Sequence, residues 1–219
     1  AQLCSGRLTL TSVTAVTTAD VTAATTIYFT PYKGSYIGLY DGTSWQAYTL
    51  TEISLAVPAS TSTMYDVWVY DNAGTLTLET PAWPNATTRA TALALQNGVY
   101  CKTGTLTRRY VGSIRTTGVS GQTEDSVAKR FVWNNYNRVV RHMKVTESTD
   151  SWGYNTATFR QANAATANQL DFIIGVSEYA VSAEVISRAQ DDTTGEGFGV
   201  GIGLDSTTTN SMTAGSSAT

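Results

Sequence analysis

The chain has 219 residues and a formal net charge of −3. Hydrophobic residues make up 42% of the chain, enough to form a buried core. Charged residues make up only 14%, well below the usual ~25%. The acidic balance argues against a nucleic-acid footprint, and no apolar run approaches the roughly 18 residues of a membrane span. We therefore expect neither nucleic acid nor membrane as a partner.

Strand patterns dominate the first half of the chain. They recur about every 8 to 14 residues, a spacing typical of an all-β sandwich or barrel. Asp41-Gly42 is a strong hairpin turn, and the turn signals at 71–74 and 96–98 indicate further hairpins. The expected strands are Arg7–Val13, Tyr36–Tyr40, Ser44–Thr49, Met64–Tyr70, Thr75–Glu79, Val99–Lys102 and Tyr110–Arg115.

A glycine- and threonine-rich segment, TTGVSGQTED at 116–125, has no apolar period and predicts a domain boundary. We expect two antiparallel β-sandwich domains, 1–115 and 122–219, the second resembling a jelly roll. The strands expected in the second are Lys129–Trp133, Arg138–Val145, Thr156–Arg160, Asn168–Val176, Val181–Ser187 and Gly197–Asp205.

The segment GEGFGVGIGLD alternates glycine with apolar residues. Strand side chains alternate between faces, so one face is apolar and the other is bare backbone. Such a strand suits close approach of another group. Either an aromatic such as Trp133 or Trp152 lies across it within one subunit, or the bare face contacts another subunit. The candidate subunit-contact residues are Gly197, Gly199, Gly201 and Gly203, in a run that begins at Gly195.

Signals for catalysis are weak. The chain has a single histidine, His142, and no nucleophile elbow or metal-ligand spacing. The carboxylates mostly lie beside Thr, Ser or Gly, where acids serve turns. We predict no catalytic residue, metal or cofactor, and no enzyme activity. The carboxylates considered are Glu124, Asp125, Asp150, Asp171, Glu178, Glu184, Asp191 and Asp192.

Cys4 and Cys101 leave two alternatives, a disulfide or two buried thiols, and the second is the commoner outcome for a lone pair.

One basic cluster, KRFVWNNYNRVVRHMK at 129–144, interleaves cations with aromatics. That pattern suits single-stranded nucleic acid, but two strands with polar residues facing water also explain it and fit the acidic chain better.

A loop with two aromatics, DSWGYN at 150–155, suggests a sugar platform. Aromatic rings offer a stacking face, although Trp is also a frequent core anchor. The candidate glycan-binding residues are Trp152, Tyr154, Asp150 and Asn155.

Several blocks resemble a family of phage and prophage virion proteins labelled tail-fibre, head-fibre or hypothetical. The blocks include RLTLTSVTAVTTADVTAATTIYFTPYKGSYIGLYDG, SVAKRFVWNNYNRVVRHMKV and TDSWGYNTATFRQANAATANQLDFIIGVSE. The resemblance implies a structural protein on the virion surface, a fibre, tip or capsid decoration. It implies other virion proteins and host-surface polysaccharide as partners, and a homotrimer, the usual symmetry of phage fibres.

Two other functions stay open. A bacterial surface adhesin or filament subunit would show the same composition. A polysaccharide-degrading enzyme is the weaker alternative, since two carboxylates can act without histidine.

Overall fold

The computed structural model describes residues 3–178, 181–188 and 197–217. The regular secondary structure of the described residues is almost entirely antiparallel β-strand, with no α-helix and one 3-10 turn at Ala162–Ala164. The predicted all-β class is therefore confirmed. The chain divides into two compact units, which we call the first unit (1–144 and 170–176) and the second unit (145–169 and 177–219).

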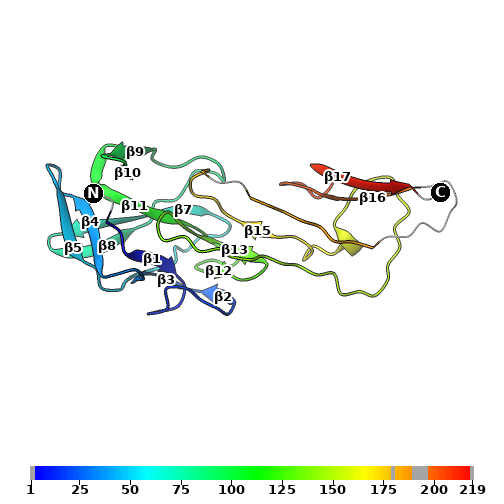
Figure 1. Ribbon diagram of the computed structural model, residues 1–219, viewed down its shortest axis with the longest axis horizontal. Helices are drawn as coiled ribbons and strands as arrows, with labels where there is room; N and C mark the ends of the chain where they lie inside the picture. Colours follow the sequence, from blue (N-terminus) through cyan, green and yellow to red (C-terminus); the bar gives the residue numbers. More distant parts are fainter. Residues whose placement is uncertain (1–2, 179–180, 189–196, 218–219) are drawn as a thin grey trace. The chain divides into compact units, whose positions relative to one another are not determined.

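The first unit contains strands β1 to β15 (Figure 1). A three-stranded sheet has the order β1-β3-β6, and a larger one runs β8-β7-β11-β10-β9, with β14 also paired to β11. A four-stranded sheet has the order β15-β13-β12-β2, and β4 and β5 form a hairpin. Their bounds are β1 (Gly6–Thr9), β2 (Val21–Ala24), β3 (Thr26–Pro31), β4 (Tyr36–Tyr40), β5 (Trp45–Thr49), β6 (Ile53–Ala56), β7 (Met64–Asn72), β8 (Thr75–Glu79), β9 (Leu93–Gln96), β10 (Val99–Lys102), β11 (Thr105–Arg115), β12 (Thr123–Asp125), β13 (Lys129–Arg130), β14 (Val132–Asn134) and β15 (Asp171–Phe172).

The predicted hairpins are present. β4 and β5 meet at Asp41-Gly42 in antiparallel register, and the Asp41 carboxylate accepts the backbone N–H groups of Thr43 and Ser44, each at 2.7 Å. These hydrogen bonds lower the pKa of Asp41 to about 2. At the β7–β8 turn the Asp71 side chain likewise accepts the N–H of Gly74. Local side-chain bonds of this kind explain why the turns were readable from sequence.

The core of the first unit lies between its sheets. Along β7, Val67 and Val69 are buried in one hydrophobic cluster with residues of β1, β3 and β4. Because strand side chains alternate, the intervening residues of β7 face the other way. The cluster comprises Leu8, Leu10, Ile27, Phe29, Ile37, Leu39, Leu50, Val57, Tyr65, Val67, Val69, Leu78, Val111 and Ile114. Two packed sheets of this kind form a sandwich.

Strand β11 is the centre of the large sheet. It pairs with β7 along one edge, while its other edge pairs first with β10 and then with β14. At Gly112, which is opposite Asn134, the β14 backbone comes so close that an added Cβ would overlap the carbonyl oxygen of Trp133. Glycine at 112 therefore permits β14 to pair there.

The division into units differs from the predicted domain boundary. Residues 116–125 make a tight connection: Thr116 bridges to Thr123, and Thr117 N–H donates to the Gln122 carbonyl at 2.8 Å. The chain then returns to the first unit through β12, β13 and β14. The glycine-rich composition marked a turn, and turns and linkers share that composition.

Three predicted strands in the second half are not strands. Arg138–Val145, Thr156–Arg160 and Val181–Ser187 have irregular backbone. The alternation in their sequences is real, but a strand also needs a partner ladder. Residues 138–144 instead form a strap held by isolated bonds: Arg130 donates to the His142 carbonyl at 2.8 Å, and Lys144 N–H donates to the Val127 carbonyl at 3.0 Å.

The residues of the first unit that flank the excursion 145–169 are bonded to neighbouring positions. Lys144 is held to Val127, and Asp171, just past the excursion 145–169, donates its N–H to the neighbouring Ala128 carbonyl at 3.0 Å. In the second unit, β16 (Gly197–Ile202) and β17 (Met212–Ser217) form an antiparallel hairpin. The jelly-roll form expected for 122–219 stays a prediction.

Candidate functional site

A buried cluster of polar and aromatic side chains lies on the face of the large sheet opposite the core. Asp66 on β7 forms an ion pair with Arg89 and accepts the Ser113 hydroxyl at 2.9 Å. The hydroxyls of Ser113 and Tyr110 are 2.6 Å apart, and burial raises the pKa of Tyr110. Arg89 also donates to the carbonyl of Gly175.

Aromatic rings enclose this cluster. Tyr110 packs edge-on against Trp68, at 5.4 Å between ring centroids, and stacks with Trp133 at 6.2 Å. Gly175 lies against this stack, where an added Cβ would overlap the Tyr110 hydroxyl and the Trp133 ring. The cluster therefore holds Gly175 against the sheet, and the Asp66, Arg89, Tyr110 and Ser113 side chains are bonded to one another.

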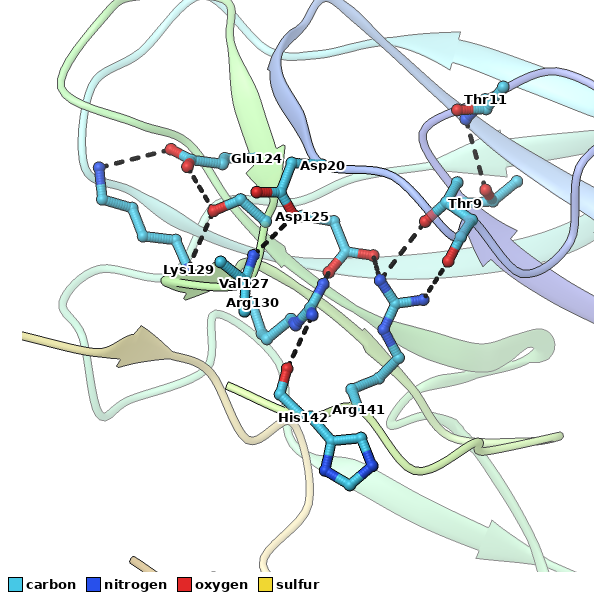
Figure 2. Close-up of polar contacts among 12 residues, drawn as sticks. Thr9, Thr11, Asp20, Glu124, Asp125, Val127, Lys129, Arg130, Arg141 and His142 are labelled. Carbon is cyan, nitrogen blue, oxygen red and sulfur yellow. Dashed lines mark hydrogen bonds and ion pairs between the residues drawn. The ribbon is translucent and has the colours of Figure 1, made fainter. Parts of the chain in front are cut away.

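A second polar cluster surrounds Asp125 at the end of β12. Figure 2 shows its carboxylate between two guanidinium groups, Arg130 at 2.9 Å and Arg141 at 3.1 Å. Arg141 also donates to the Thr17 carbonyl at 3.1 Å. Beside it, Glu124 pairs with Lys129 at 3.4 Å. These contacts join β12, β13, the strap 138–144 and the loop before β2.

This network accounts for most of the predicted basic cluster. Lys129, Arg130 and Arg141 are held by carboxylates, and Arg138 stacks over Trp133 and donates to the Asn134 carbonyl at 3.0 Å. Cations held in this way within the fold are poorly placed to neutralise phosphates. The segment was predicted to form two strands with polar residues facing water. That prediction was incomplete, because residues 138–144 form the strap and have irregular backbone.

The carboxylates and the single histidine do not converge. The His142 ring is exposed and points away from the Asp125 carboxylate (Figure 2). Across the part of the chain that the structure describes, no three His, Cys, Asp or Glu side chains are grouped as a metal site would require. Sequence reasoning considered Glu124 and Asp125 as candidate acids, and the structure places both in ion pairs.

The two cysteines carry free thiols. Burial raises the pKa of Cys101 to about 11 and also raises the pKa of Cys4. A thiol is a nucleophile only as a thiolate, so neither is activated for chemistry.

The predicted glycan-binding residues lie together on the irregular excursion 145–169. Trp152 is 44% exposed and Tyr154 is 40% exposed, and Asp150 and Asn155 are exposed as well. The loop has internal order, since the Tyr154 hydroxyl donates to the Thr158 carbonyl at 2.7 Å. Two aromatic surfaces and two polar side chains are therefore open to solvent, as a sugar platform requires.

Sequence reasoning missed one residue of this loop. The Arg160 guanidinium lies over the Tyr154 ring, at 3.8 Å from its centroid. It covers one face of the Tyr154 ring and adds a positive charge to the loop. Side chains six residues apart do not touch in a regular strand or helix, so the loop conformation brings Arg160 and Tyr154 together.

The glycine ladder is partly explained within the chain. An added Cβ at Gly199 would lie 3.4 Å from the Phe159 ring, and one at Gly201 would overlap the Asn210 side chain. At Gly203 it would overlap the Ser206 carbonyl oxygen. The residue over Gly199 is thus Phe159 rather than Trp133 or Trp152. Gly197 pairs with Ser217, Gly195 lies outside the described residues, and the subunit-contact assignment stays a prediction.

A shallow cavity of about 450 Å³ lies beside β2, lined by Leu10, residues 20–26 and Tyr28. None of the predicted site residues lines it. The one carboxylate there, Asp20, accepts the Val127 N–H at 2.8 Å. Among the described residues no helix has the length and hydropathy to cross a membrane.

Comparison of the chain with protein-family models, with curated proteins and with solved structures finds no match.

Proposed function

We propose that this protein is a structural component of the outer surface of a bacteriophage particle: a fibre, a tip or a capsid decoration. The observation that supports it best is the contrast between the units. The first is a packed sandwich with a buried hydrophobic core, and among the residues of the second whose burial is described no hydrophobic residue is buried. A chain of this kind suits an assembly in which neighbours complete the packing.

The proposal also accords with the low charge and with the virion-like sequence blocks. It includes oligomerisation, with a homotrimer expected, contacts to other virion proteins and the glycine ladder as a contact between subunits. It places no catalytic residue, metal or cofactor in the chain. A jelly-roll-like second domain belongs to the same proposal.

Immunogold labelling of purified particles tests the location, with an antibody raised against the first unit. We expect label on the outer surface of the particle. Label on the bacterial envelope in cells that make no particles would instead support an adhesin or filament subunit. Release of reducing ends from host polysaccharide by the purified protein would support the enzyme alternative.

A second function, adhesion to host-surface glycans, is favoured by the exposed pair Trp152 and Tyr154. Stacking on one aromatic ring contributes about 1 kcal/mol to the free energy of binding. Trp152→Ala should therefore weaken cell binding about fivefold or more. Tyr36→Ala is the matched control, because Tyr36 on β4 is 50% exposed in the first unit. If both variants bind cells as the unmodified protein does, the loop is not the adhesion site.

A further inference from the structure

An arginine and a tyrosine of the excursion 145–169 are stacked on one another. The Arg160 guanidinium lies 3.8 Å from the centroid of the Tyr154 ring, and a cation over an aromatic face is attracted by the charge distribution of the ring. Arg160 also donates to the Gly153 carbonyl at 3.4 Å, and the Tyr154 hydroxyl donates to the Thr158 carbonyl at 2.7 Å. The loop itself therefore holds the guanidinium and the ring in place.

The second unit also supports the backbone beside this stack. Phe159 precedes Arg160, and its ring lies over Gly199 of β16, where an added Cβ would be 3.4 Å from the ring. The excursion 145–169 and β16 belong to the same unit. A binding group that is held before its ligand arrives loses less conformational entropy on binding, so this arrangement suits recognition.

The charge of Arg160 is not neutralised within the part of the chain that the structure describes. Arg160 is exposed, and no described carboxylate forms an ion pair with it. The Glu147 carboxylate of the same loop accepts the Thr149 N–H and the Asn168 amide instead. A guanidinium has five N–H donors, and the one bond to a carbonyl leaves most of them for an anion from outside.

The neighbouring residues of the loop suit a sugar that carries such an anion. Trp152 is 44% exposed and offers a stacking face. Asp150 and Asn155 are exposed and can bond to sugar hydroxyls. A carboxylate matches the planar fork of an arginine with two parallel hydrogen bonds. Asp150 would repel a bare anion but accepts hydroxyls, so the set fits a ligand that has both hydroxyl groups and an acid.

We propose that this loop binds an acidic sugar, with Arg160 paired to the sugar carboxylate and Tyr154 holding Arg160 in position. The inference rests on the proposed adhesion to host glycans and names their class: polysaccharides that contain a uronic acid or another carboxylate-bearing sugar. Arg160 then determines specificity, whereas Trp152 contributes affinity for neutral and acidic sugars alike.

Affinity electrophoresis of the full chain tests the proposal. The gels contain polygalacturonate, alginate or hyaluronan, or the same polymer after chemical reduction of its carboxyl groups to alcohols. We expect at least one of the three acidic polymers to retard the unmodified protein. Its reduced form should bind about tenfold more weakly or less, because charge-assisted bidentate hydrogen bonds are among the strongest that a protein makes.

Arg160→Gln should weaken binding to the acidic polymer about tenfold and leave binding to the reduced polymer unchanged. Arg188→Gln is the matched control, because Arg188 is the other basic residue of the second unit, is also exposed, and its loss changes the net charge equally. Arg160→Lys keeps the charge but lacks the planar fork, so its affinity should fall between those of Arg160→Gln and the unmodified protein.

The Glu147 carboxyl, whose pKa the loop lowers to about 2, reports whether Arg160→Gln keeps the loop folded. If its NMR titration midpoint rises to about 4.5 in that variant, the loop has unfolded, and Arg160→Lys carries the comparison with Arg188→Gln.

Three results would overturn the acidic-sugar site. Equal weakening by Arg160→Gln and Arg188→Gln would show that binding depends on net charge alone. Equal binding of the acidic and reduced polymers would remove the acidic specificity and leave glycan adhesion in place. If none of the acidic polymers retards the protein, the acidic-sugar site is wrong, and the cell binding of Trp152→Ala then decides separately whether the loop adheres to glycans.

Discussion

The two units of this chain are stabilised in different ways. The first buries hydrophobic residues from several sheets and joins its buried polar groups to one another, as Asp66 does with Arg89 and Ser113. In the second, the described part has one hairpin and loops held by local side-chain bonds. Strand-like sequence alone does not make a sandwich: a strand needs both a ladder partner and a covered face.

The largest effect should come from breaking the buried ion pair of the first unit. Asp66→Ala leaves the Arg89 charge without its carboxylate, and removal of one partner of a buried pair costs about 3–5 kcal/mol. We expect that loss in the free energy of unfolding, measured by urea denaturation. Asp150→Ala, at an exposed acid of the second unit, should change it by less than about 0.5 kcal/mol. Equal losses would remove the contrast between the units.

A smaller loss of stability should come from adding a methyl group at a glycine that lies against other side chains. Gly175→Ala places a methyl group against Tyr110 and Trp133, and overpacking of this kind costs about 1–3 kcal/mol. Gly199→Ala in the ladder meets only the Phe159 ring at 3.4 Å, so a much smaller loss is expected. Thermal melts of the two variants make the comparison. A ladder variant that melts as early as Gly175→Ala would show that the hairpin contributes to the main core.

The smallest effect concerns acid titration, and it reports on whether the second unit is ordered in the free chain. Hydrogen bonds from Thr149 and Asn168 lower the pKa of Glu147 from 4.5 to about 2. A depressed pKa stabilises the fold above pH 4.5, and the contribution is lost as pH falls towards 2. NMR titration of the Glu147 carboxyl should therefore give a midpoint near 2.

Asp41 is the reference for that titration, because its pKa is also lowered to about 2 by the turn of the first unit. A midpoint near 2 for Asp41 together with one near 4.5 for Glu147 would mean that the excursion 145–169 folds only in the assembly.

Sequence was most informative where local chemistry decides the structure. The β4–β5 and β7–β8 hairpins were predicted at the correct positions because Asp41 and Asp71 bond to their own turns. The all-β class followed from the spacing of the strands.

The sequence did not predict which strands pair when they are far apart along the chain. Nothing in the sequence marks β14 as a partner of β11, or β13 as the parallel partner of β15. The predicted domain boundary differed from the observed units for that reason. Among site residues, the exposure of Trp152 and Tyr154 agreed with the loop prediction, whereas the position of Arg160 over Tyr154 depends on a loop conformation that no periodicity encodes.

The residues that flank the excursion 145–169, Lys144 and Asp171, are hydrogen-bonded to consecutive residues, Val127 and Ala128. A loop whose ends are already side by side can change length cheaply, since each doubling adds only about 0.6 kcal/mol of closure entropy. We therefore expect insertions, deletions and new residues between 145 and 169 to leave the sandwich unaltered. The sequence and length of this segment can therefore change during evolution while the sandwich that supports it keeps its fold.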